Sequence, residues 1–287
     1  MKKIVFLVCV ITAFFSGCTT KAPAEVIATT KPVYEFTSRL CDGTDITVSQ
    51  LITENVSCLH DYTLKAEQMK AVESAQLVMI NGLGLEDFLE DVLDASNLVI
   101  DSSEGLQHIQ HHGHNNDHSH AHEEDAHIWL SPANAKQMVS NIYTALCEQY
   151  PNYSNTLTQN LTQLYAQLDT LEAYGHEKLS TLSCRDLITF HDGFYYFAES
   201  FDLEVLYAIE EESGSEASAQ ELIALISLVN EQSIPAIFIE TNGSASAASI
   251  ISNETGAKIY KLDMGMSEKG YFESMYYNIN TIWEALQ

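Results

Sequence analysis

The longest helical pattern in the chain runs from Pro151 to about Leu182. Apolar residues recur in it at spacings of three and four, so one face of the helix is expected to be buried. These residues are Leu157, Leu161, Leu164, Leu168 and Leu171. At about 1.5 Å per residue such a helix extends over roughly 40 Å, which is long for a helix covering one α/β layer. We expect a rod that joins two lobes, and Gly175 marks either a bend or a local end in it.

Short β-rich runs alternate with helical patterns on both sides of this rod. Before it, strands are predicted at EVIATT, DITVSQLIT, AQLVMING and LVID, with helices at LKAEQMKAVESA and LEDFLEDVLDA. After it, strands are predicted at DLITF, LEVLYAI, AIFIE and AKIYKL, with helices at ASAQELIALISLVNEQ and ASAASIISNETG. Another helix should begin at Pro132 with Ser131 as its N-cap. The predicted fold is α/β, with two parallel-sheet lobes joined by a long rigid helix.

The N-terminus has the features of an export signal. Lys2 and Lys3 precede the apolar run IVFLVCVITAFF, which is shorter than the roughly 20 residues that span a bilayer. The residues FSGC, ending at Cys18, resemble the bacterial lipobox, with Phe15 where Leu is more usual. That resemblance implies cleavage before Cys18 and attachment of diacylglycerol to its sulfur. A plain signal peptide with an incidental cysteine is the alternative.

These patterns divide the chain into five predicted parts. They are a signal peptide (1–17), a lipidated tether (18–25), an N-terminal lobe (26–150) with a flexible histidine-rich loop (108–126), a connecting helix (151–182) and a C-terminal lobe (183–287).

The mature chain would keep four cysteines besides Cys18, namely Cys41, Cys58, Cys147 and Cys184. Four cysteines in an exported protein allow three disulfide connectivities, and sequence alone does not choose between them. We favour Cys41–Cys58 because it closes the shortest loop. Buried free thiols are the alternative.

The chain is strongly acidic, with 40 acidic and 13 basic residues and a formal net charge of −27. Such a surface repels nucleic acid, and no basic patch offsets it. It raises the local concentration of cations, although it also serves solubility.

Eight of the eleven histidines lie within residues 108–127. Imidazole is the commonest side-chain ligand of transition metals, so this stretch points to metal handling. Its small polar neighbours show no apolar periodicity, so we expect weak, pH-sensitive capture rather than a rigid site. The histidines assigned to this auxiliary capture are His108, His111, His112, His114, His118, His120 and His122.

A fixed metal site needs ligands on regular elements. His60 follows a predicted strand and its turn, His127 leads into the helix at Pro132, and His191 and Asp263 end or follow strands. Ligands of open α/β sheets bind beyond the carboxyl ends of the strands, so one cleft between the lobes could collect all four. His176 lies on the rod and is interpreted as a surface residue.

Five segments occur in an order that resembles one protein family. They are SCLHDYTLKAEQMKAVESAQLVMINGLGLEDFL, DAHIWLSP, TFHDGFYYFAESFDL, EASAQELIALI and IFIETNGSASAASIISNETGAKIYKLD. Together they resemble the zinc and manganese solute-binding lipoproteins of ABC importers (cluster A-I). The similarity covers essentially the whole mature chain, and a histidine-rich loop before HIWL is typical of zinc members. The family fold is two lobes joined by a rigid helix, with the metal between them.

The resemblance implies that His60, His127, His191 and Asp263 bind the metal. Manganese members tend to have Glu at the third position. Three imidazoles and a carboxylate suit tetrahedral Zn²⁺, whereas Mn²⁺ prefers more oxygen ligands. The turn TENVSCL departs from the Pro-rich turn of the family, and it makes a contact between the metal and a free Cys58 thiol conceivable.

Three acidic residues lie near the predicted ligands in the sequence or match a family position. Glu240 matches a family position that we interpret as structural. Asp61 and Asp192 are either helix caps or hydrogen-bond partners of the neighbouring histidines.

The predicted function is therefore an extracytoplasmic, membrane-anchored zinc-binding lipoprotein, monomeric and not an enzyme. It would deliver Zn²⁺ to a membrane permease driven by a cytoplasmic ATPase, and it would contact the lipid bilayer through Cys18. The ATPase must be another chain, because no GxxxxGK[ST] motif occurs here. A manganese- or iron-binding protein of the same importer class, a zinc hydrolase and a surface adhesin are the alternatives.

Overall fold

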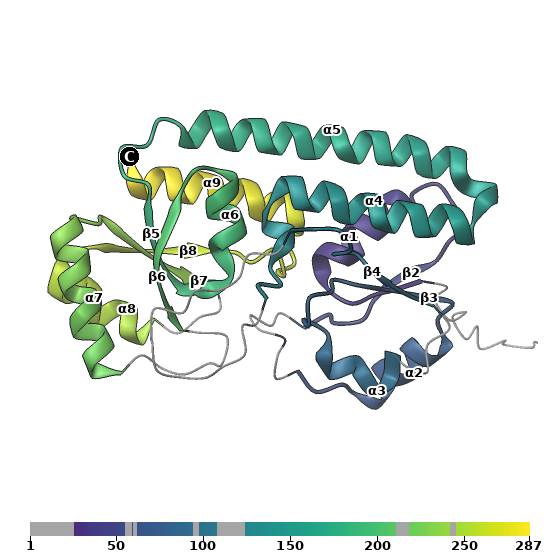
Figure 1. Ribbon diagram of the computed structural model, residues 1–287, viewed down its shortest axis with the longest axis horizontal. Helices are drawn as coiled ribbons and strands as arrows, with labels where there is room; N and C mark the ends of the chain where they lie inside the picture. The colour runs from purple at the N-terminus through teal and green to yellow at the C-terminus, as the bar shows by residue number, and fades with distance from the viewer. Residues whose placement is uncertain are drawn as a thin grey trace, which may run out of the picture.

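The computed structural model describes residues 26–54, 59, 62–93, 98–107, 124–210, 218–241 and 245–287. They form two lobes, each built on a parallel four-stranded sheet, with one long helix running along both (Figure 1). This arrangement confirms the predicted fold class. Among the helices in these ranges, none combines the length and the apolar character that crossing a membrane requires.

The sheet of the N-terminal lobe contains β1 (Val26–Ala28), β2 (Val48–Gln50), β3 (Leu77–Ile80) and β4 (Val99–Asp101). Its order is β2-β1-β3-β4, and every pairing is parallel. The central strands β1 and β3 are buried almost throughout, which is why they appear in the sequence as continuous apolar runs.

The sheet of the C-terminal lobe repeats this topology. It contains β5 (Asp186–His191), β6 (Glu204–Glu210), β7 (Ala236–Glu240) and β8 (Lys258–Leu262), in the parallel order β6-β5-β7-β8. In each lobe the chain order reverses between the two central strands. Side chains that follow these strands therefore lie at the switch point where α/β sheets bind ligands.

Helices cover both sheets. The N-terminal lobe has α1 (Lys31–Leu40), α2 (Ala66–Ser74), α3 (Glu90–Leu93) and α4 (Pro132–Gln149), and the C-terminal lobe has α6 (Tyr195–Ser200), α7 (Ala219–Gln232), α8 (Ser246–Thr255) and α9 (Tyr271–Leu286). Four single 3-10 turns complete them: η1 (Asp87–Leu89), η2 (Ile128–Leu130), η3 (Pro151–Tyr153) and η4 (Asp192–Phe194).

The start of α4 is the one that the sequence predicts. The hydroxyl of Ser131 accepts a hydrogen bond from the N–H of Asn134, and Pro132 occupies the first turn, where its missing N–H costs nothing.

The long helix α5 (Ser154–Leu179) has 26 residues and packs on α4 and on α9. Four of the five predicted leucines are buried on its inner face, and Leu161 is partly buried. Gly175 neither ends nor caps the helix. A Cβ at this position would lie 2.2 Å from Cε1 of the buried Phe201, so glycine is needed for the close approach of the two segments.

Polar contacts fix the two lobes to each other and to α5. Arg39 of α1 donates to Glu35 and to Gln167 of α5, and its guanidinium lies over the ring of Phe272 of α9. Glu35 in turn accepts from the first N–H of α9, at Tyr271 (2.5 Å), where a carboxylate stabilises the helix N-terminus. One surface arginine thus connects three helices from both lobes.

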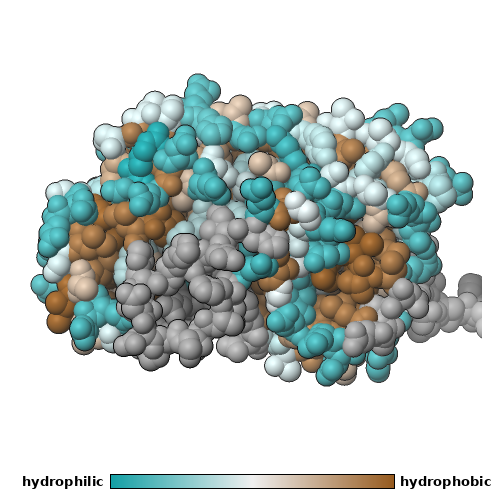
Figure 2. Space-filling view, in the orientation of Figure 1, coloured by the Kyte–Doolittle hydropathy of each residue, from teal (hydrophilic) through white to brown (hydrophobic). Residues whose placement is uncertain are grey.

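The face in Figure 2 is mostly hydrophilic, with separate hydrophobic areas on the two lobes. Within the described residues, the large apolar side chains that are exposed are Met69, Leu98, Ile223 and Ile250. Ile223 on α7 is the most exposed of these, at 67%.

The packing of Gly175 can be tested by adding a methyl group. Gly175→Ala is expected to lower the free energy of unfolding by about 1–3 kcal/mol, because the Cβ would overlap the Phe201 ring. At an exposed helix position the same change would raise stability by about 1 kcal/mol. Urea unfolding followed by circular dichroism measures the difference. Gln159→Ala, at an exposed position of α5, is the control and should change stability by less than about 0.5 kcal/mol. A Gly175→Ala variant more stable than the wild type would contradict the packing.

Candidate metal centre

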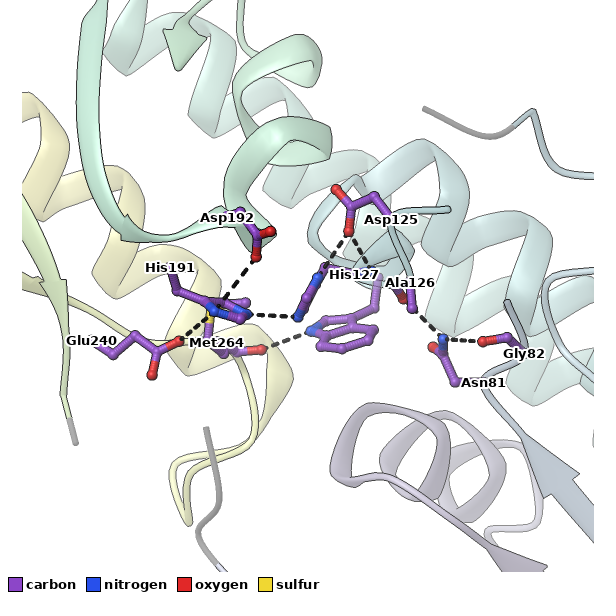
Figure 3. A network of polar contacts seen from close by, with 10 residues as sticks. Asn81, Gly82, Asp125, Ala126, His127, His191, Asp192, Glu240 and Met264 are labelled. Carbon is purple, nitrogen blue, oxygen red and sulfur yellow. Dashed lines mark hydrogen bonds and ion pairs between the residues drawn. The ribbon is translucent and has the colours of Figure 1, made fainter. Parts of the chain in front are cut away.

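His127 lies at the entry to η2, and its side chain is held by a carboxylate two residues earlier. Oδ1 of the fully buried Asp125 accepts hydrogen bonds from the His127 backbone N–H (2.9 Å) and from ring Nδ1 (2.8 Å). One oxygen thus fixes both the backbone and the ring of His127 (Figure 3). Holding the second nitrogen of a metal-binding histidine in this way is typical of metal sites.

His191 ends β5 in the other lobe, and its ring faces that of His127. The two Nε2 atoms are 3.0 Å apart, with ring centroids 4.8 Å apart and ring planes at 84°. The structure therefore brings together two of the four predicted ligands, from segments 64 residues apart and from different lobes.

The Asp125 carboxylate bears on the tautomer of His127. A carboxylate only accepts, so its contact with Nδ1 favours the form that carries the hydrogen on Nδ1. In the neutral form of this tautomer, Nε2 has the lone pair that a metal would bind.

Two carboxylates lie on the far side of the His191 ring. Nδ1 of His191 is 3.6 Å from Oδ1 of Asp192 and 4.0 Å from Oε1 of Glu240, which ends β7 beside β5 (Figure 3). Both residues are buried. The tautomer of His191 with its hydrogen on Nδ1 would direct that hydrogen toward these carboxylates and leave the Nε2 lone pair free for a metal.

The spacing of the two rings suits a tetrahedral ion. With Zn–N distances of about 2.0–2.1 Å, two ligand nitrogens of a tetrahedron lie about 3.3 Å apart. The observed 3.0 Å between the two Nε2 atoms is close to this value.

Asp263 directly follows β8 and is buried, but its carboxylate is engaged within its own loop. Oδ1 accepts from the N–H of Gly265 (2.9 Å) and Oδ2 from the hydroxyl of Ser267 (2.6 Å). Asn278 of α9 holds the Asp263 backbone through both its N–H and its C=O. Over the described residues, no group of three His, Cys, Asp or Glu side chains lies close enough to hold a metal.

Several predicted site residues lie outside the described residues. They are Cys18, Cys58, His60, Asp61 and the histidines of 108–122. The Cys41–Cys58 disulfide therefore stays a prediction, with Cys41 buried in the N-terminal core. Cys147 and Cys184 are free thiols.

Two further predictions concern His176 and Glu240. His176 is an exposed residue of α5, as expected, and its ring packs edge-on against Phe201. Glu240, interpreted from the sequence as structural, lies with its carboxylate beside the His191 ring.

Asp125 was not predicted from the sequence as a partner of His127. Its signal was an acidic residue two positions before a histidine, in DAH. That spacing is too common to be informative without the structure.

Comparisons with known proteins identify the family of the chain. The family model described as zinc-uptake complex component A, periplasmic (ZnuA), matches residues 26–285. The chain belongs to this family.

The similarity extends to relatives and to solved structures. The zinc-binding protein TroA of Treponema pallidum is 30% identical over 244 residues, covering 79% of this chain and 78% of TroA. The zinc-binding lipoprotein AdcA of Streptococcus pneumoniae is 27% identical over 276 residues, covering 90% of this chain but 54% of AdcA. The chain thus spans about half the length of AdcA. A crystal structure of ZnuA superposes with a TM-score of 0.82 at 29% identity, covering 92% of this chain and all of that one.

The role of Asp125 can be tested in the metal-free protein. Long-range ¹H–¹⁵N NMR correlations should show His127 as a single tautomer with hydrogen on Nδ1, because Asp125 accepts that hydrogen. Asp125→Asn should mix the tautomers or reverse them. Asp192→Asn, which changes a carboxylate beside the other histidine, is the matched control and should leave the His127 pattern unchanged. An unchanged single tautomer in Asp125→Asn would contradict the assignment.

Proposed function

We propose that the chain captures Zn²⁺ between its two lobes outside the cytoplasm and delivers it to the permease of an ABC importer. The observation that carries this proposal is the 3.0 Å approach of Nε2 of His127 to Nε2 of His191. Membership of a zinc-uptake family supports it. So do the relatives TroA and AdcA, which are both described as zinc-binding.

The complete ligand set in this proposal is His60, His127, His191 and Asp263. The hydrogen bonds from Gly265 and Ser267 do not prevent Asp263 from binding, because a carboxylate has about four acceptor positions and these bonds use two. They orient its oxygens, as hydrogen bonds to a metal-binding carboxylate commonly do. His60 would supply the third imidazole from the N-terminal lobe.

This set favours zinc over manganese and uptake over catalysis. Three nitrogens and one oxygen suit tetrahedral Zn²⁺, whereas Mn²⁺ is better held by a larger number of oxygen ligands. A zinc hydrolase needs a coordination position open to water, and four protein ligands would fill the tetrahedron. Reversible capture needs no such position.

Two further parts of the proposal concern segments outside the described residues. The histidines of 108–122 would bind zinc weakly and raise its concentration near the cleft. Cys18 would carry the lipid that anchors the protein to the membrane that holds the permease. The description of AdcA as a lipoprotein supports this anchor.

Replacing either facing histidine should remove tight binding. His127→Ala and His191→Ala are each expected to weaken Zn²⁺ affinity by several orders of magnitude, because each removes a ligand from a four-ligand site. Titration against a chromophoric zinc chelator measures the affinity. His176→Ala removes an exposed histidine of α5 and is the matched control, expected to bind like the wild type. Wild-type affinity in His127→Ala would refute the site.

Deleting residues 108–122 should separate weak binding from tight binding. The tight site is expected to keep its affinity and a stoichiometry of one, while the weaker equivalents disappear. Isothermal titration calorimetry with Zn²⁺ resolves the two classes. Loss of the tight site on deletion would show that the loop supplies its ligands.

A further inference from the structure

The turn that follows β3 contacts the segment that carries His127. The side-chain amide of Asn81 donates a hydrogen bond to the carbonyl of Ala126 (2.9 Å), the residue directly before His127 (Figure 3). Asn81 is completely buried and lies at the switch point of the N-terminal sheet. This bond acts on the peptide beside His127, whereas Asp125 acts on the His127 ring and its own N–H.

Glu86 fixes the conformation of Asn81. Its Oε1 accepts from the N–H of Asn81 (2.8 Å) and its Oε2 from the N–H of Gly82 (3.0 Å), so the carboxylate closes the turn on itself. The hydroxyl of Thr29, just beyond β1, donates to Oε1 (2.5 Å). Burial raises the pKa of Glu86 to about 7 in spite of these three donors. The hydrogen bonds offset part of the cost of burying the carboxyl group.

The backbone of the turn is equally constrained. Gly82 has φ +97°, a conformation that side chains other than glycine rarely adopt. A Cβ at Gly82 would lie 2.0 Å from Oδ1 of Asp101, which ends β4. The hydroxyl of Ser102 donates to the carbonyl of Asn81 (3.1 Å). The position of the Asn81 side chain is therefore defined by β1, β3 and β4 together.

We propose that Asn81 is a positioning residue for the metal site, held by Glu86, and that it places the backbone of His127 so that Nε2 meets its counterpart on His191. The proposal rests on the proposed function in one respect, namely that His127 binds the ion. The effect of Asn81 on the His127 ring does not depend on metal. Hydrogen-bond partners outside the ligand set typically contribute about 10–100-fold to metal affinity.

The test compares substitutions of the Asn81 side chain with a substitution of Glu86, which binds the Asn81 backbone N–H. Asn81→Ala removes the donor to Ala126, and Asn81→Asp keeps the shape but turns an acceptor toward the Ala126 carbonyl. Thr37→Ala is the control, because it removes a buried side-chain hydrogen bond, to the carbonyl of Val33 within α1, that does not belong to this network. Glu86→Gln replaces one acceptor oxygen with a donor that faces an N–H of the turn.

Three measurements are made on each full-length variant. They are Zn²⁺ affinity by chelator competition, the visible absorption spectrum of the Co²⁺-loaded protein, and the ¹H–¹⁵N signals of the His127 ring without metal. Asn81→Ala and Asn81→Asp are expected to weaken Zn²⁺ binding about 10–100-fold, to change the Co²⁺ spectrum and to shift the His127 signals. Glu86→Gln should act in the same direction. Thr37→Ala should keep the wild-type spectrum and ring signals.

Two outcomes separate failure of this inference from failure of the proposed function. If Asn81→Ala and Asn81→Asp fold and keep the wild-type ring signals and Co²⁺ spectrum, the positioning role is wrong, whatever His127 binds. If the ring signals shift but neither these variants nor His127→Ala lose zinc affinity, positioning stands and the assignment of His127 as a ligand is wrong.

Discussion

The contact between two imidazoles from different lobes is the interaction on which the rest of the structure depends. A metal site shared between two lobes needs its ligand atoms held to within about 0.5 Å of the binding geometry. The lobes must therefore keep a fixed separation. The helix α5 supplies part of this constraint, because it packs on α4 of one lobe and α9 of the other. Close to the site, the indole N–H of Trp129, whose ring centroid lies 5.3 Å from that of His127, donates to the carbonyl of Met264 (2.7 Å). The Glu35–Tyr271 bond adds a third connection between the lobes.

The charges around the pair support the proposal of a divalent cation between the rings. Asp125, Asp192 and Glu240 lie beside the outer nitrogens of the two rings, and all three are buried. Buried anions are costly unless they are compensated, and a cation between the rings would be balanced by the carboxylates through the imidazoles. Each carboxylate would make its imidazole a more basic ligand for the ion. Because protons compete with the ion for the same nitrogens, such a site holds its metal less well as the pH falls.

The sequence predicted the parts of this protein that follow from local patterns. The strands, the α4 start at Ser131 and the leucine face of α5 each depend on a period or a cap that neighbouring residues provide. The placement of His191 at the end of β5 followed from the same reasoning. The sequence predicts a bend or an end at Gly175, whereas the glycine is needed because of the ring of Phe201, 26 residues away and in contact only after folding.

The contacts that orient the site are non-local, and this is why the sequence did not predict them. Asn81 acts on Ala126 at a separation of 45 residues, and NGLGLE looks from its composition like an ordinary turn. Glu240 comes beside His191 only because β7 pairs with β5. A family resemblance names ligand positions, but it does not say which carboxylate holds which ring nitrogen.

The most direct measurement is a crystal structure of the zinc-loaded protein with anomalous diffraction collected at the zinc edge. The account predicts one strong peak between the lobes, bound by Nε2 of both His127 and His191 at about 2.0–2.1 Å. It also predicts that Nδ1 of His127 stays bonded to Asp125. A tightly bound ion elsewhere, with the two rings still in direct contact, would contradict the account.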